Sequence, residues 1–277
     1  MAISAERCSQ LEALCGTIRQ DVLRTLYQIQ TGHPGGSLSV CEILTALYME
    51  CANISKDNLD DMSRDRIVLT KGHAAPILYR LLAEIGVLEM DELVTLRQVG
   101  SRLQGHPCAA KTPGVELSTG PLGIGLPAAL GMALALRQQG YDSFVYAVMG
   151  DGELDEGAVW EAAMSAAKMK ADHLIAIVDW NKVQLDGPVD AVMPLGDLEG
   201  KWRSFGWNVL RCDGHSIRAL VDTIELAKRT AGSPTVILAD TIKGKGVSFM
   251  EGKNTYHGKA LTREEYEKAI RELGGVL

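Results

Sequence analysis

The stretch that decides the fold runs from residue 144 to residue 181, where two apolar segments each end in a short polar cluster. The first segment with its cluster is Phe144-Val145-Tyr146-Ala147-Val148-Met149-Gly150-Asp151-Gly152. The second is Leu174-Ile175-Ala176-Ile177-Val178-Asp179-Trp180-Asn181. Each apolar run has the length of a buried strand, and residues 156–170, rich in Ala, Met, Glu and Lys, favour a helix between them. The stretch therefore predicts one βαβ unit.

The two polar clusters are expected at the same edge of one sheet. A right-handed crossover makes the strands parallel, so both clusters leave the sheet at its carboxyl end, where open α/β folds bind ligands. The Asp151 carboxylate and the Asn181 amide oxygen meet there, beside the turn made by Gly150 and Gly152, and the Val183 carbonyl could add a third oxygen. Hard oxygen ligands beside a glycine turn suit Mg²⁺ that carries a diphosphate. The alternative is an ordinary βα turn in which the glycines serve geometry alone.

The bulk composition indicates an acidic globular chain. Its 277 residues are 46% hydrophobic and 23% charged, so a sizeable core can be buried. The formal net charge is −7 without a Lys or Arg run, which argues against nucleic acid as the main partner. No apolar stretch approaches the roughly 20 residues of a membrane span, and the N-terminus lacks a signal-peptide core. The six cysteines form no CxxC pair, so neither structural zinc nor a disulfide framework is expected, and a reducing cytoplasm fits best.

The rest of the pattern extends the βαβ unit into a single α/β domain over residues 1–277, a doubly wound parallel sheet flanked by helices. Further strands are expected at 66–70, 208–210 and 235–239. Further helices are expected at 9–30, 39–50, 74–86, 91–99, 126–139, 217–230 and 263–273. Two glycine-rich loops, at 100–125 and 243–259, remain between these elements. Loops of such length in a compact domain are usually functional or disordered.

Five of the six histidines adjoin Gly or Pro, and four of these stand in predicted loops, each at a break between regular elements. They are His33, His73, His106 and His257. A single loop histidine is usually only solvated, but four at such breaks suggest a cleft lined with imidazoles, which move protons near neutral pH and bind phosphate when charged. His215 follows Asp213-Gly214 and has a similar setting, on weaker grounds. His173 begins a strand, so we expect a structural role for it.

A further glycine-rich segment precedes the helix expected at 126–139. It is Ser118-Thr119-Gly120-Pro121-Leu122-Gly123-Ile124-Gly125. Glycines at this density let the backbone approach a flat ligand closely, and the N-terminus of the following helix can face an anionic group.

Six sequence motifs, in this order along the chain, resemble those of transketolases. They are Gly32-His33-Pro34-Gly35-Gly36-Ser37-Leu38-Ser39, Lys71-Gly72-His73-Ala74, Gly105-His106-Pro107, Ser118-Thr119-Gly120-Pro121-Leu122-Gly123, Gly150-Asp151-Gly152 with Asn181, and His257-Gly258. The resemblance covers essentially the whole chain. It implies the thiamine diphosphate-binding fold of the diphosphate (PP) domain and an enzyme that transfers a two-carbon ketol unit from a ketose or ketose phosphate to an aldose or aldose phosphate.

The same resemblance implies roles for individual residues. The ligands of Mg²⁺, or of another divalent cation, would be Asp151, Asn181 and the Val183 carbonyl. The residues around thiamine diphosphate would be His73, Gly120, Pro121, Leu122, Gly150, Asp151, Gly152, Glu156, Asn181 and His257, with Glu156 at an interface. The catalytic histidines would be His33, His73, His106 and His257, of which His33 and His106 would face the substrate.

Three positions depart from the family pattern. Trp180 stands in the second metal motif where Asp or Asn is usual, which leaves the metal ligand intact but changes its surroundings. Cys108 stands where an acidic residue is common, and Leu185 stands where some members place a glutamine.

Transketolases are usually more than twice as long as this chain, so the resemblance covers only their diphosphate-binding part. The pyrimidine-binding and C-terminal domains are absent here, and we expect them on a separate chain, the C-terminal transketolase subunit. Because sites of this family form between domains of different protomers, a two-fold symmetric α2β2 assembly is expected.

Two other interpretations stay open. The chain could be a subunit of another thiamine diphosphate enzyme, a decarboxylating synthase or a 2-oxo acid dehydrogenase, although those resemble it mainly at the Gly-Asp-Gly motif and its asparagine. It could also be a non-catalytic homologue that keeps the fold, although a scaffold needs neither a metal pair nor four loop histidines.

Overall fold

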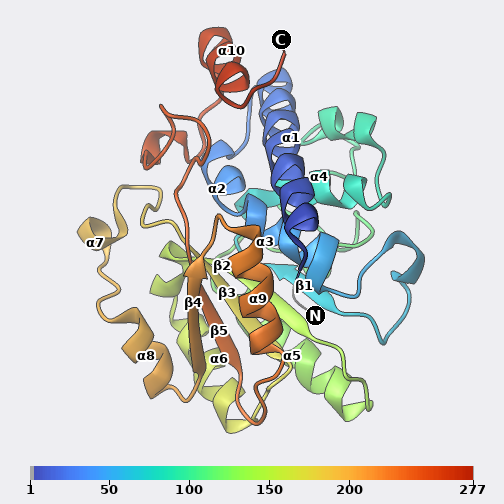
Figure 1. Cartoon of the computed structure of the whole chain (residues 1–277), viewed down its shortest axis with the longest axis vertical. Helices are drawn as coiled ribbons and strands as arrows, with labels where there is room; N and C mark the ends of the chain where they lie inside the picture. The colour runs from blue at the N-terminus through green and yellow to red at the C-terminus, as the bar shows by residue number, and fades with distance from the viewer. Residues whose placement is uncertain (1–2, 277) are drawn as a thin grey trace.

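The computed structural model describes residues 3–276, which form a five-stranded parallel sheet with helices on both faces (Figure 1). Its strands are β1 (Arg66–Leu69), β2 (Val145–Gly150), β3 (Leu174–Trp180), β4 (Asn208–Asp213) and β5 (Thr235–Asp240). They lie in the order β1-β2-β3-β5-β4, and each neighbouring pair is parallel. The expected fold class, an α/β doubly wound sheet, is confirmed.

The register of β2 and β3 places the two polar clusters of the deciding stretch side by side. Gly150 at the end of β2 pairs with Asp179 near the end of β3. Asp151 and Asn181 follow these strands directly, so both leave the carboxyl edge of the sheet at neighbouring points. The expected βαβ unit is present, with helix α6 (Gly157–Lys168) as its crossover.

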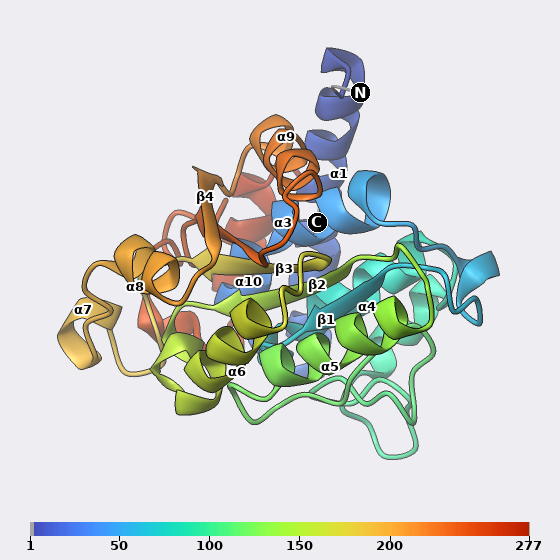
Figure 2. The ribbon, with the colours of Figure 1, turned by 90° about the horizontal axis from the view of Figure 1, so that it is seen from below.

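Helices cover the two faces of the sheet in two groups, as Figure 2 shows for α5 and α6 on one side and α9 on the other. One face carries α5 (Gly125–Gln138), α6 and α8 (Leu198–Ser204). The other carries α1 (Ala5–Ile29), α3 (Cys41–Ala46), α4 (Ala75–Glu84) and α9 (Ile217–Ala227). The chain runs from β1 through β2 to β3 but returns from edge strand β4 to β5. Right-handed crossovers in opposite directions put their helices on opposite faces.

Alternating strand residues fill the two cores. In β2, Val145 and Ala147 pack under α5 and α6, whereas Tyr146 and Val148 pack under the α1 group. Successive side chains of a strand point to opposite faces, so apolar residues at every position are needed when both faces are covered. This explains the unbroken apolar runs seen in the sequence.

The C-terminal helix α10 (Arg263–Glu272) packs against the N-terminal helix, near the top of Figure 1. Thr262 caps α10, and Glu265 completes a capping box. The rings of Tyr27 and Tyr266 stack with centroids 4.2 Å apart.

Several predicted element boundaries were wrong. The helix expected at 39–50 begins earlier, as α2 (Pro34–Ser39), is interrupted at Val40, and ends in the π-helical turn η1 (Leu47–Cys51). Proline suits the first turn of a helix, so the break after α1 is shorter than expected. The helix expected at 91–99 is only a 3₁₀ helix, η4 (Met90–Thr95), and Arg97 just after it has a left-handed φ of 65°.

Some short elements were not predicted because they carry too few residues for a periodic signal. They are α7 (Val189–Val192), α8, and the 3₁₀ helices η2 (Lys56–Asn58), η3 (Gly72–Ala74), η5 (Gly152–Asp155) and η6 (Asn254–Tyr256). Among residues 3–276, none of the helices combines the length and the apolar character that crossing a membrane requires.

Candidate active site

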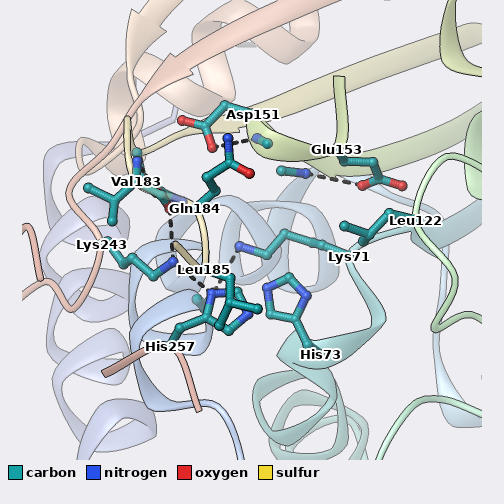
Figure 3. Close-up of a pocket in the computed structure, with 14 residues that line it drawn as sticks. Lys71, His73, Leu122, Asp151, Glu153, Val183, Gln184, Leu185, Lys243 and His257 are labelled. Atoms are coloured by element: carbon teal, nitrogen blue, oxygen red, sulfur yellow. Dashed lines mark hydrogen bonds between the residues drawn. The ribbon is translucent and has the colours of Figure 1, made fainter. Parts of the chain in front are cut away.

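A pocket opens at the carboxyl edge of the sheet and is lined by residues from six separate parts of the chain, two of them represented by Gly36 and Leu122 (Figure 3). The ends of β2 and β3 contribute Asp151, Asn181 and Val183. The segment after β1 contributes Lys71 and His73, and the loop after β5 contributes Lys243 and His257.

Three oxygen-bearing groups of the predicted metal site meet in this pocket. The Asp151 carboxylate accepts hydrogen bonds from the backbone N–H groups of Gly152, at 2.8 Å, and Lys182. The Asn181 amide oxygen accepts the Val183 N–H at 3.1 Å. A Cβ at Gly152 would lie 2.9 Å from the Gln184 Cβ, so glycine permits this close approach of the two turns.

A positive group already lies against one of these oxygens. The Lys243 ammonium donates to the Val183 carbonyl at 2.8 Å (Figure 3). In residues 3–276, no three His, Cys, Asp or Glu side chains gather closely enough to hold a metal. A cation here would therefore depend on one carboxylate, one amide and one carbonyl, a set of hard oxygens that suits Mg²⁺ completed by phosphate and water.

Burial shifts the pKa values of the Asp151 carboxyl group and the Lys243 ammonium group. Burial, together with the negative charge of Asp179, raises the pKa of Asp151 to about 6. Burial and the neighbouring Lys71 lower the pKa of Lys243 to about 8. A bound divalent cation would favour the carboxylate of Asp151, because a nearby positive charge opposes protonation.

A buried polar network, which we call the strut, adjoins the pocket and includes Lys71 from its lining. It consists of Lys71, Asp179, Ser39 and Thr241. The Asp179 carboxylate accepts from the Lys71 ammonium, from the Ser39 hydroxyl at 2.6 Å and from the Thr241 hydroxyl. Lys71 also donates to the Gly36 carbonyl at 3.0 Å. Burial alone would raise the pKa of Asp179, but Lys71 and the two hydroxyls hold it below its ordinary value.

Glu153 connects the glycine-rich segment 118–125 to the end of β2. Its carboxylate accepts from the Thr70 hydroxyl at 2.6 Å, from the Gly123 N–H at 2.9 Å and from the Gly150 N–H at 3.3 Å. Burial raises the pKa of Glu153. Sequence reasoning gave no role to Glu153, Lys243 or the strut. The sequence signals were that Ser39 and Lys71 stand in two of the six motifs and that Glu153 directly follows a third.

The four loop histidines form one cluster, as their sequence setting suggested. The ring centroids of His73 and His257 lie 4.9 Å apart, and His33 lies 5.5 Å from each of them and 6.2 Å from His106. His73 and His257 line the pocket, and His33 and His106 extend the cluster beyond it. His257 Nδ1 lies 2.9 Å from the Lys243 ammonium, and His33 Nδ1 lies 3.3 Å from the Arg97 guanidinium.

All four imidazoles favour the neutral form. Burial and the neighbouring Arg97 lower the pKa of His33 to about 4, and burial and Lys243 lower that of His257 to about 3. The pKa of His73 is also lowered, by burial and Lys71, and that of His106 by burial and Arg97. A neutral imidazole offers one N–H donor and one acceptor nitrogen. The cluster can therefore bind hydroxyl groups and move protons without adding positive charge beside a cation.

The other predicted site residues lie around the pocket with differing exposure. Leu122 and Gly150 line it, whereas Gly120 packs against His106 and Pro121 is exposed. Glu156 is exposed at the start of α6, with its Cβ in the space that a side chain at Gly123 would need. The roles assigned to these residues stay predictions.

Two of the three departures from the family pattern have a clear location. Leu185 lines the pocket and is 58% exposed, so it presents an apolar surface at the pocket edge. The Trp180 ring lies 3.6 Å from the Lys182 ammonium, outside the pocket.

Comparison with known proteins identifies the family. The model of the transketolase thiamine diphosphate binding domain matches residues 11–276. The chain belongs to this family.

Two relatives match this chain over most of their own length. The 6-deoxy-6-sulfo-D-fructose transketolase subunit of Clostridium sp. is 45% identical over 97% of this chain and 98% of its own length. One subunit of the apulose-4-phosphate transketolase of Actinobacillus succinogenes is 45% identical over 87% of each chain.

A solved transketolase shows the same fold in a longer chain. The crystal structure of the Campylobacter jejuni enzyme superimposes with a TM-score of 0.90 at 31% identity, over 96% of this chain but only 43% of its own. The predicted resemblance to transketolases is therefore confirmed, as is the interpretation of this chain as their thiamine diphosphate-binding part. The match favours the transketolase interpretation over the decarboxylating and non-catalytic ones.

Proposed function

We propose that this chain is the diphosphate-binding subunit of a two-chain transketolase and acts in carbohydrate metabolism. Together with a C-terminal subunit, it transfers a two-carbon ketol unit from a ketose or ketose phosphate to an aldose or aldose phosphate. The observation that carries the proposal is the convergence of Asp151, Asn181 and the Val183 carbonyl with the histidine cluster in one pocket.

The pocket residues divide between holding a cofactor and handling a substrate. Asp151, Asn181 and the Val183 carbonyl would hold Mg²⁺, and Lys243, His73 and His257 would face the diphosphate. Thiamine diphosphate, when bound, supplies the nucleophilic carbon on which ketol transfer depends, and the protein supplies orientation and electrostatics. Glu153 fixes the segment that carries Leu122, which would lie against the thiazolium and pyrimidine rings with Gly120 and Pro121.

The histidines would handle the hydroxyl and carbonyl groups of the sugar. Because His33 and His257 are neutral at pH 7, each can donate an N–H to a developing oxyanion or take a hydroxyl proton. His33 and His106 belong to the cluster but do not line the pocket that holds the proposed metal ligands, and they would face the substrate. Arg97, beside His33, adds a positive charge there.

The remaining part of the active site would come from the partner chain. This chain matches less than half of the Campylobacter transketolase, and the two relatives named as subunits match it nearly end to end. The pyrimidine and C-terminal domains would then be supplied by the C-terminal subunit in an α2β2 assembly, with Glu156 at the interface. The six free cysteines suit a reducing cytoplasm.

Reconstitution of the two chains tests this function. The chain should be purified alone and together with a C-terminal subunit from a neighbouring reading frame that carries the pyrimidine-domain pattern. Ketol transfer is then measured with thiamine diphosphate and Mg²⁺. The ketol donors tested should include phosphorylated ketoses and 6-deoxy-6-sulfo-D-fructose. The latter appears in the name of the Clostridium relative. We expect activity only when both chains are present.

Two results would contradict the proposal. Ketol transfer by this chain alone would exclude a divided active site. Decarboxylation of pyruvate by the complex, without ketol transfer, would assign it to another reaction class.

A further inference from the structure

His215 lies outside the pocket, between β4 and α9, and connects a buried carboxylate to the loop after β5. Its Nδ1 lies 3.0 Å from a Glu42 carboxylate oxygen, and its Nε2 accepts the Ile242 backbone N–H at 2.8 Å. Because a backbone N–H can only donate, Nε2 carries no hydrogen. The neutral ring therefore has its proton on Nδ1 and donates it to Glu42.

Glu42 lies in α3 and is held in place by an ion pair with α1. Arg19 from α1 donates to both oxygens of the Glu42 carboxylate, at 2.6 and 2.7 Å, and also to the Leu38 carbonyl at 3.0 Å. Both side chains are buried. A bidentate guanidinium–carboxylate pair has little freedom, so Glu42 presents a fixed acceptor to His215.

A close backbone contact brings His215 within reach of Ile242. The Gly214 N–H donates to the Asp240 carbonyl at 2.8 Å. A Cβ at Gly214 would lie 2.5 Å from the Thr241 side chain, so only glycine permits this approach. The turn before α9 and the end of β5 are thus joined at two points, the Gly214 amide and the His215 ring.

Ile242 is the residue immediately before Lys243. The Lys243 ammonium lies against the Val183 carbonyl and 2.9 Å from His257 Nδ1. On the other side of Lys243, the Gly244 N–H donates to the Gly35 carbonyl at 3.0 Å. The backbone of Lys243 is therefore held on both sides, and the His215 ring makes one of the two attachments.

We propose that His215 is a positioning residue, and that the chain of contacts Arg19–Glu42–His215 fixes the Ile242 backbone and thereby the place of Lys243 in the pocket. The contact chain connects helices α1 and α3 to a loop at the candidate active site. Only its effect on cofactor affinity rests on the proposed function.

Two variants of His215 separate this role from simple filling of space. In His215→Gln the amide oxygen can reach the position of Nε2 and still accept from Ile242. In His215→Asn the shorter amide reaches only the position of Nδ1, so it can bond Glu42 but not Ile242. Both variants keep a neutral polar side chain at residue 215 and differ in which of the two ring-nitrogen positions it reaches.

Hydrogen exchange of the full chain, without cofactor, gives the direct measurement. We expect the Ile242 and Gly244 amides to exchange roughly tenfold faster in His215→Asn, which loses the hydrogen bond to Ile242. The increase should be clearly smaller in His215→Gln, which keeps that acceptor but loses the contact with Glu42. The Val148 amide in β2 should be unchanged in both, which controls for global stability. Equal exchange of Ile242 in wild type and His215→Asn would overturn the proposal, as would equal acceleration in the two variants.

Two further measurements complete the test. In the wild type, ¹⁵N NMR of His215 should show the Nδ1–H tautomer, and an Nε2–H tautomer would overturn the proposal even if the variants failed to fold. In the complex, His215→Asn should weaken Mg²⁺-dependent thiamine diphosphate binding several-fold, and His215→Gln should not. Failure of the wild type to bind the cofactor would contradict the proposed function, whereas unchanged exchange at Ile242 would contradict the positioning role.

Discussion

The strut and the histidine cluster both contribute side chains to the pocket and are both polar, but they are built in opposite ways. In the strut, Lys71 is 1% exposed and Asp179 is fully buried. The Lys71 ammonium neutralises the Asp179 carboxylate, and the two hydroxyls donate hydrogen bonds to that carboxylate. In the cluster, the imidazoles meet ring against ring, at centroid distances of 4.9–6.2 Å, and lie nearer to solvent. The strut is complete without a ligand, whereas the cluster keeps ring nitrogens free to bond one.

This difference indicates which part of the site is rigid before anything binds. The strut joins β1, β3, α2 and the loop after β5, so it fixes the edge of the sheet from which Asp151 and Asn181 project. The histidines come from four loops or turns and converge only through the fold. We therefore expect changes in the strut to act mainly on stability, and changes in the pocket residues outside the strut to act mainly on binding.

The largest effect is expected from Lys71→Met. The variant leaves the buried Asp179 carboxylate without its charged partner, and loss of one partner from a buried pair costs about 3–5 kcal/mol. Urea unfolding at pH 7 measures the change in the free energy of unfolding. The matched control is Lys268→Met, which removes a half-exposed lysine 3.7 Å from Glu272 and should cost less than about 1 kcal/mol. If Lys71→Met lowered the free energy of unfolding by less than about 1 kcal/mol, the strut would not be needed for stability.

The second effect concerns binding rather than stability. Asp151→Ala should weaken Mg²⁺-dependent thiamine diphosphate binding at least ~100-fold, since even residues that only orient metal ligands contribute 10–100-fold. Titration calorimetry of the complex measures it, with the exposed neighbour variant Asp155→Ala as control. Wild-type affinity in Asp151→Ala would refute the metal assignment.

Asp151 should also differ from the strut in its effect on folding. Its pKa of about 6 lies above the ordinary 3.8, so the folded protein binds the proton more tightly. The free energy of unfolding therefore falls as the pH rises from 3.8 to about 6, and the loss is complete above pH 6. Asp151→Asn removes this buried charge but leaves one of the two backbone N–H donors without an acceptor, so the two effects oppose each other. The free energy of unfolding in cation-free buffer at pH 7 should therefore change much less than in Lys71→Met. A loss of free energy of unfolding as large as that in Lys71→Met would show that Asp151, like the strut, is needed for folding rather than for binding.

The smallest effect is a pH dependence from the histidine cluster. His33 and His257 have pKa values of about 4 and 3 in the folded chain, below the ordinary 6.5, so the unfolded chain binds more protons between these values. The free energy of unfolding should therefore be fully retained above pH 6.5 and fall as the pH decreases toward 4.

A double variant, His33→Asn with His257→Asn, isolates this contribution. Because both rings are partly exposed and solvent screens them, we expect its pH slope to be shallower by on the order of 1 kcal/mol across that range. Urea titrations at several pH values between 4 and 7 measure the slopes. Equal slopes in variant and wild type would show that the imidazoles do not resist protonation.

Most of the fold could be predicted because its signals are local. The apolar runs of β2 and β3, the helix between them and the polar residues at their ends lie within one βαβ unit, whose handedness is nearly invariant. The helix expected at 91–99 failed because a turn with left-handed Arg97 follows the short 3₁₀ helix, and hydrophobic spacing carries no sign of such a turn.

The sequence by itself determined the parallel sheet, the pairing of Asp151 with Asn181 at its carboxyl edge, and the loops that carry the four histidines. These features follow from hydrophobic periodicity, from the ends of the apolar runs and from the positions of glycines, all of which are properties of residues close together in the sequence. Only the tertiary structure decided the partners of Lys71, Glu153, His215 and Lys243. Their contacts join residues far apart in the chain, 108 positions for Lys71 with Asp179 and 173 for His215 with Glu42, so no local pattern encodes them. Such bonds form because a buried charge or N–H must find a partner, and the packing of the whole domain determines which one is in reach.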